Sequence, residues 1–142
     1  MAIAALALAG GLCAFGLGGG SAGSSSIPLN NPDADNMAQA TTAFLAERLP
    51  PAATTLFVVP HDRCGRDRLS AALDSELRKA GFALASHREV SREAHEVRYH
   101  LTGGWQDSII LRLSIDGRET TQLYVRDRDG EFRPAGPLTV KE

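Results

Sequence analysis

The sequence predicts an α+β fold with two layers, in which two helices pack on a mainly antiparallel sheet that ends in a C-terminal β-meander. Three observations lead to this prediction. Apolar residues recur at helical spacing in two segments before residue 82, they alternate with polar residues from His95 onward, and Asp-Gly pairs at 116–117 and 129–130 mark tight turns. Helices followed by hairpin-linked strands are typical of a domain whose helices cover one face of a sheet.

Length and charge indicate one folded domain behind an uncharged N-terminal segment. The chain has 142 residues and a formal net charge of -2, and no Lys, Arg, Asp or Glu comes before Asp33. We divide it into a signal- or lipoprotein-like segment at 1–20, a flexible tether rich in Gly, Ser, Asn and Pro at 21–35, and an α+β periplasmic domain at 36–142. The apolar run at 2–17 is shorter than the roughly 20 residues of a membrane helix and predicts export.

The domain begins with a predicted helix and a buried strand. The helix runs from Asn36 to Leu49, with Asp33 and Asp35 as candidate capping residues and two prolines after it. The β-branched and aromatic run at 54–60 then predicts a buried strand.

A second helix is predicted at 66–81. Its leucines and alanines recur every three or four residues, and Gly81 is a typical C-terminal stop. Asp62 or Asp67 is placed to cap its start. A short strand at 82–86 follows.

Antiparallel strands make up the rest of the domain. Apolar and polar residues alternate from 97 to 101 and from 109 to 115, so that one side of each strand faces a core. A strand at 122–126 then has Leu123 and Val125 on one side, and the segment from Pro134 to Pro137 runs along an edge.

Two polar clusters are candidates for a catalytic or metal site. His61 and Cys64 lie beside the start of the second helix, where a thiolate nucleophile of a small hydrolase is one interpretation and a solvated capping loop the other. We favour the loop and expect no enzyme activity. His87, His95 and His100 lack metal-ligand spacing, so we expect surface histidines, no metal and no cofactor.

Nucleic acid is a poor candidate partner for this chain. Its arginines alternate with aspartates at 62–68 and at 126–129, whereas a nucleic-acid surface needs clustered Lys and Arg. The body of the domain is nearly neutral, so we expect protein partners and no nucleic acid.

Aromatic residues of the predicted hairpins are the candidate contact points for a partner. Trp105 lies in a glycine-flanked turn, where it is either an exposed anchor or a residue folded back over the sheet edge. Tyr124 in the final hairpin is a second, less informative candidate.

Cys13 is the candidate lipid-attachment residue. It follows an apolar run and precedes the tether, as in a bacterial lipoprotein, but Leu12 stands where the signal peptidase prefers a small side chain. The alternative is that Cys13 is a small apolar residue of a leader, and both interpretations stay open.

The order of these parts resembles the conjugal transfer protein TrbH family, small lipoproteins of plasmid mating-pair formation systems. The likeness rests on the N-terminal cysteine, the tether, and two longer segments, "TTLFVVPHDRCGRDRLSAALDSELRKAGFAL" and "SIILRLSIDGRETTQLYVRDRDGEFRPAGPLTV". The resemblance implies lipid attachment, for which Cys13 is the only matching position.

If the resemblance holds, the chain is a structural, accessory lipoprotein of a conjugative type IV secretion apparatus. It would lie in the periplasm, anchored to the outer membrane, and bind other subunits of the apparatus or further copies of itself through its sheet edge and hairpin turns. The alternative is a free periplasmic module that binds a small ligand or peptidoglycan, which requires a concave pocket with convergent polar groups.

Overall fold

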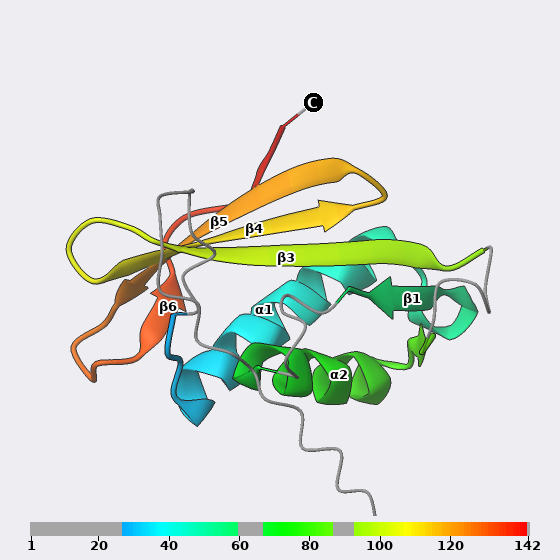
Figure 1. Cartoon of the computed structure of the whole chain (residues 1–142), viewed down its shortest axis with the longest axis horizontal. Coiled ribbons are helices and arrows are strands. Elements are labelled where there is room, and N and C mark those ends of the chain that lie inside the picture. Colours follow the sequence, from blue (N-terminus) through cyan, green and yellow to red (C-terminus); the bar gives the residue numbers. More distant parts are fainter. Residues whose placement is uncertain (1–26, 60–66, 87–92, 142) are drawn as a thin grey trace, which may run out of the picture.

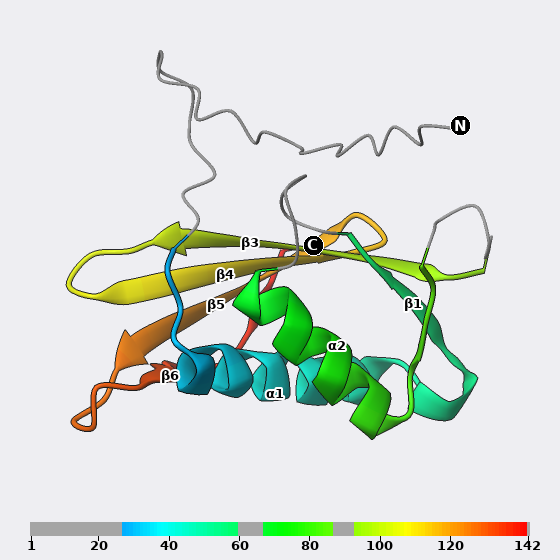
Figure 2. The same cartoon turned by 60° about the horizontal axis from the view of Figure 1, so that its bottom comes forward.

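The structure, a computed structural model, describes residues 27–59, 67–86 and 93–141 and has an α+β fold (Figure 1). Both helices lie on the same side of one sheet, and no helix of the described residues lies on its other side (Figure 2). The elements in chain order are helix α1 (Asn31–Arg48), a short 3-10 helix (Pro51–Ala53), strand β1 (Thr55–Val58), helix α2 (Arg68–Ala80), and strands β2 (Ala83–Leu84), β3 (His95–Gly103), β4 (Ser108–Ile115), β5 (Arg118–Arg126), β6 (Phe132–Pro134) and β7 (Thr139–Val140).

The sheet is mixed, with the strand order β2-β1-β3-β4-β5-β6. Strand β1 pairs in parallel with β2 and with β3, whereas β3, β4, β5 and β6 pair antiparallel, and β7 pairs with the other end of β5. The parallel pair of β1 and β2 follows from the connection through α2, since parallel neighbours need a crossover rather than a tight turn. Sequence alternation cannot reveal this part of the sheet.

Helix α1 begins at Asn31 and not at Asn36. Its cap is Asn30, whose side-chain oxygen accepts a hydrogen bond of 2.8 Å from the Asp33 amide, and Pro32 fits the first turn because that turn needs no amide hydrogen from it. Asp33 and Asp35 are therefore not the cap, and the helix includes residues that we had assigned to the tether.

Helix α2 confirms the prediction that Asp67 caps its start. The Asp67 carboxylate accepts a hydrogen bond of 2.6 Å from the Ser70 amide, and Gly81 ends the helix with φ at 100° in the left-handed region that glycine adopts without strain. Leu69, Leu73 and Leu77 are its buried residues. Asp62, the other candidate cap, lies outside the described residues.

The core fills the space between the helices and the covered face of the sheet. Its fully buried side chains come from both helices and from all the long strands, and they include Met37, Leu45, Leu56, Leu69, Leu73, Leu77, Val97, Ile109, Leu113 and Tyr124.

Strand β5 turns its more polar side toward that core. The turn at Asp116 and Gly117 pairs Leu111 with Gln122 and Ile109 with Tyr124, so these β5 residues share the buried side of β4. Leu123 and Val125 do lie together on one side of the strand, as predicted, but that side faces away from the helices and leaves them 40% and 38% exposed. The buried residues of β5 are Thr120, Gln122 and Tyr124.

A buried carboxylate joins the start of α1 to the last hairpin. Asp33 is 1% exposed, and its Oδ1 accepts a hydrogen bond of 2.8 Å from the amide of Phe132 in β6. Its Oδ2 lies 3.7 Å from Nη1 of Arg126, whose guanidinium stacks on the Phe132 ring at 4.1 Å. This contact fixes the C-terminal strands against the point where the chain enters the domain.

Candidate functional site

The hairpin between β3 and β4 presents Trp105 to solvent. The Trp105 side chain is 85% exposed, and the hairpin extends past the N-terminal end of α1 (Figure 1). Of the two interpretations of this residue, the one in which it folds back over the sheet edge is wrong. An exposed tryptophan is the residue type most enriched at the energetic centres of protein interfaces.

The turn that carries Trp105 is closely defined by its own hydrogen bonds. The Gly104 amide donates to the Ser108 carbonyl at 2.8 Å, and the Ser108 hydroxyl donates to the Trp105 carbonyl at 2.6 Å. Gln106 and Asp107 both have φ at 54°, a conformation that costs a residue with a side chain roughly 1–2 kcal/mol. Strained backbone of this kind persists where the surroundings hold it and is frequent at functional sites.

Gly104 leaves room for the Ser108 hydroxyl. A Cβ atom at this position would overlap Oγ of Ser108, so a larger residue would displace the hydroxyl that donates to the Trp105 carbonyl. The glycine next to Trp105 in the sequence therefore has a steric role in orienting the turn.

Tyr124 is a core residue and not a surface contact. Its side chain is 0% exposed, so it cannot reach a partner of the folded domain, which corrects our expectation for it. Its hydroxyl has no hydrogen bond of normal geometry. Burial raises the pKa of Tyr124 to about 12, and the nearby Thr41 hydroxyl offsets a small part of this shift.

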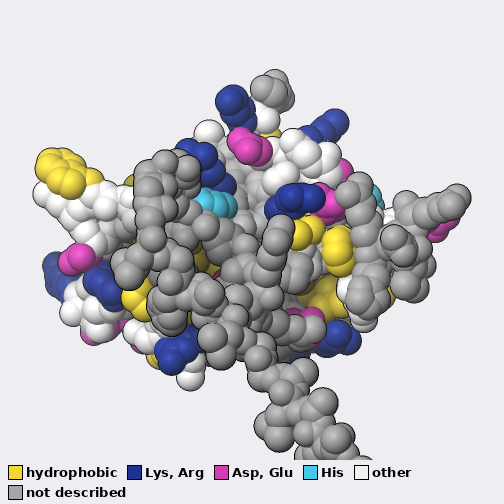
Figure 3. All heavy atoms as spheres, in the orientation of Figure 1, with side chains coloured by type: hydrophobic (Ala, Val, Ile, Leu, Met, Phe, Trp, Pro, Cys, Tyr) yellow, Lys and Arg dark blue, Asp and Glu magenta, His cyan; other side chains and the backbone are white. Residues whose placement is uncertain are grey.

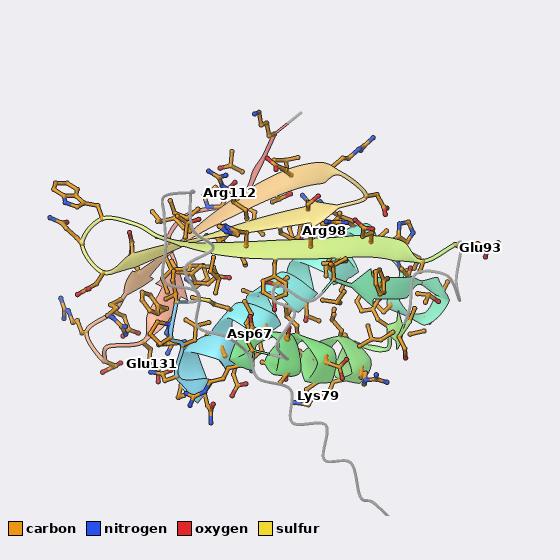
Figure 4. All side chains as sticks on the ribbon, viewed as in Figure 1. Asp67, Lys79, Glu93, Arg98, Arg112 and Glu131 are labelled. Carbon is orange, nitrogen blue, oxygen red and sulfur yellow. The ribbon has the colours of Figure 1, made fainter. Side chains whose placement is uncertain are left out.

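The side of the sheet away from the helices, which we call the open face, is a second candidate surface. It carries the outward side chains of β3, β4 and β5, with the apolar residues toward the Trp105 hairpin and the charged ones further along the strands. Both Arg98 and Arg112 point away from the helices (Figure 4). A shallow hollow of about 460 Å³ lies here, and among the residues that line it are Arg98, His100, Arg112, Ser114 and Glu119.

The two arginines of the open face differ in their partners. Arg98 donates a hydrogen bond of 2.5 Å to the Glu96 carboxylate, and this contact raises the pKa of the guanidinium. Within the described part of the chain, no carboxylate lies at ion-pair distance from Arg112. Figure 3 shows basic side chains beside a histidine on the part of this face that is in view.

The two histidines that the structure describes, His95 and His100, bond to different partners. His95 bonds through Nδ1 to the Asp116 carboxylate at 2.5 Å, and His100 bonds through Nδ1 to the Thr102 hydroxyl at 3.1 Å. His87 lies outside the described residues. Among residues 27–59, 67–86 and 93–141, no group of three or more His, Cys, Asp and Glu side chains is placed to hold a metal ion.

The thiol and imidazole of the hydrolase interpretation, Cys64 and His61, lie outside the described residues. Asp67, which follows them closely along the chain, accepts a hydrogen bond of 2.9 Å from the Tyr99 hydroxyl. The Tyr99 hydroxyl also bonds to the Ser70 hydroxyl at 2.5 Å. Because Asp67 also caps α2, this cluster stabilises the helix start against β3, which is a structural role.

A second hollow, of about 310 Å³, lies between the first turns of the two helices and is lined by Asn31, Asp35, Arg68 and small residues of α2. Like the hollow on the open face, it is shallow and open to solvent. Pockets that bind small molecules normally enclose most of the ligand surface, so both hollows suit contact with a larger partner better.

A comparison with models of known protein families identifies the family of this chain. The family model of the conjugal transfer protein TrbH matches residues 18–142. The chain belongs to the TrbH family. A search of curated proteins and a search of solved structures each gave no match.

Membership of the TrbH family associates the chain with conjugal transfer. The match covers the whole described domain and all of the segment 21–35 that we assign to the tether, so the resemblance inferred from the order of parts is confirmed. Cys13 precedes the matched residues and lies outside the described ones. In the described ranges, no helix of this TrbH-family domain has the length and apolar character that crossing a membrane requires.

Proposed function

We propose that this TrbH-family protein is an accessory structural component of a conjugative type IV secretion apparatus, the mating-pair formation system of a plasmid. It acts by binding other subunits and not by catalysis. It lies in the periplasm, held at the outer membrane by a lipid on Cys13, with the tether giving the domain its reach.

The observation that carries this proposal is the exposed Trp105 on a strained, hydrogen-bonded turn in a member of a conjugal transfer family. A rigid aromatic side chain loses little entropy on binding, so a turn that holds it in solvent favours protein contact. The two shallow hollows suit contact with another protein better than enclosure of a small substrate.

The test of localisation is the intact mass and the membrane fraction of the protein isolated from donor cells. We expect a mature chain that begins at a lipidated Cys13 and sediments with the outer membrane. Cys13→Ser removes the lipid and the sedimentation, whereas the matched control Cys64→Ser retains both. A soluble chain with an unmodified N-terminus would sink the lipoprotein part of the proposal.

That soluble outcome would favour the second candidate, a free periplasmic module that binds a small ligand or peptidoglycan. The observation behind it is the hollow on the open face, where Arg98 and Arg112 are placed to contact carboxylates. Co-sedimentation with purified peptidoglycan that is lost in Arg112→Gln would support this candidate, and its absence would leave the assembly function alone.

A further inference from the structure

We propose that the open face of the sheet, over β3, β4 and β5, is a docking surface for an acidic amphipathic helix of a partner protein. The inference shares with the proposed function only the premise that the domain binds another protein. It concerns a different surface from the tip of the Trp105 hairpin and assigns that surface a partner of stated chemistry.

The first observation is the reversed pattern of β5. A strand over a core normally places its apolar residues inward, yet β5 buries Thr120 and Gln122 beside Tyr124 and exposes Leu123 and Val125. Ile110 of β4 pairs with Leu123 across the ladder and adds to the same side. These three residues, Ile110, Leu123 and Val125, form an apolar strip on the open face. Apolar side chains exposed in the isolated domain are expected at binding surfaces, where the partner buries them.

The second observation is the charge beside that strip. Arg112 lies two residues after Ile110 on the same side of β4, which places it about 6.6 Å further along the strand. It is exposed and has no carboxylate partner among the described residues, and the hollow of about 460 Å³ opens beside it. A partner that covers the strip therefore gains by placing an Asp or Glu opposite Arg112.

The third observation decides the partner's secondary structure. Strand β4, at the centre of the face, pairs with β5 along its whole length and with β3 from Ile109 to Ile115, whereas β3 pairs with β1 only from His95 to Val97. The backbone of β4 is thus paired on both sides, so a segment that lies over β4 meets side chains and not free backbone groups. A segment that lies on it must satisfy its own backbone groups, as a helix does.

The dimensions agree with a helix. One helical turn rises about 5.4 Å, which is close to the separation between the apolar strip and Arg112. Apolar residues on one turn can therefore contact the strip while an acidic residue on the next turn contacts Arg112. The helices on the opposite face of this sheet show the same mode of packing (Figure 2).

The test uses the purified full chain, labelled with ¹⁵N, and two synthetic helical peptides of 18 residues. Both carry leucines on one face, flanked by glutamates in one peptide and by lysines in the other. We expect the glutamate peptide to shift the amide signals of β3, β4 and β5. Its affinity falls about tenfold in Arg112→Glu, and that variant gains affinity for the lysine peptide.

The matched control is Arg78→Glu, which makes the same charge change on the exposed side of α2. We expect it to leave the peptide affinity within about twofold of the original. Arg112→Gln, a milder change, weakens binding without reversing the charge preference, and circular dichroism of each variant verifies the fold.

Several results would overturn the inference: equal affinity for both peptides, signal shifts confined to the helices, or an affinity unchanged by Arg112→Glu. Binding of phosphatidylglycerol vesicles through Arg112 in place of the peptide would also overturn it and assign the face to a lipid surface. The test needs neither lipid on Cys13 nor mating cells, so its failure is distinguishable from failure of the proposed function.

Discussion

The two faces of the sheet differ in what their residues contact. The covered face packs Ile109, Leu111 and Leu113 of β4 against the helices, and each of these side chains is at most 3% exposed. The open face exposes Leu123 and Val125 of the neighbouring strand β5, on the same side of the sheet as Arg112.

The apolar residues of the two faces therefore differ in how much they contribute to the stability of the domain. On the covered face their burial stabilises the domain, at roughly 25 cal/mol for each Å² removed from water. On the open face they contribute little to the isolated domain, and our proposal of a docked helix gives them a function there. The substitutions below test this division from the largest expected effect to the smallest.

The largest effect is expected from truncating a leucine on the covered face. Leu113→Ala leaves a cavity under the helices, because Leu113 is 2% exposed, and should lower the free energy of unfolding by about 2–5 kcal/mol. The matched change on the open face, Leu123→Ala, should lower it by less than about 1 kcal/mol. Urea unfolding of both variants measures the contrast, and equal losses would contradict the division between the faces.

The next effect comes from the buried carboxylate at the start of α1. Asp33→Ala leaves the Phe132 amide without an acceptor and should cost about 1–3 kcal/mol. Asp35→Ala, in the same helical turn but exposed, is the control and should stay within about 0.5 kcal/mol. Thermal unfolding measures both. A small loss in Asp33→Ala would mean that α1 and β6 are held together by apolar contact alone.

The smallest effect is expected from the buried phenol. Tyr124→Phe removes a hydroxyl without a good hydrogen bond and should be neutral or stabilising by up to about 1 kcal/mol at pH 7. Because burial raises the pKa of Tyr124 from 10.0 to about 12, the unfolded chain ionises first as pH rises. The stability that depends on the neutral phenol is complete below pH 10.0 and is lost above it.

The pH dependence of unfolding tests this assignment. The original chain should lose stability between pH 10.0 and about 12, whereas Tyr124→Phe should lose less over the same range. Parallel curves for the two chains would mean that Tyr124 ionises as readily in the folded domain as in the unfolded one.

Local signals in the sequence were sufficient for several elements. Helix α2 has an aspartate cap, leucines at helical spacing and Gly81 at its end, and all three are found where the pattern places them. The start of α1 was missed because Asp33 and Asp35 resemble capping residues, although Asn30 followed by Pro32 in the first turn is an equally typical start.

The orientation of β5 was available in the sequence but depends on register. Counting outward from the two-residue turn at 116–117 pairs buried Leu113 with Thr120 and Ile109 with Tyr124, which places Tyr124 inward. Hydrophobicity alone favours Leu123 and Val125 for the core, so it gives the opposite orientation.

Exposure of Trp105 and the parallel pairing of β1 could not be predicted from local sequence. The first depends on the turn formed by Gly104 and Ser108, and the second on how α2 crosses the sheet. The position of Arg112 beside the apolar strip likewise becomes visible only when β3, β4 and β5 lie side by side.

The most direct test of the account is the conjugation frequency of donor cells whose plasmid carries Trp105→Ala. Because the Trp105 side chain is 85% exposed, the substitution should leave protein abundance and thermal unfolding unchanged. The account predicts a fall in transfer of about tenfold or more, as expected for loss of an interface anchor worth at least about 1.4 kcal/mol. Transfer at the original frequency, with equal abundance on an immunoblot, would contradict it.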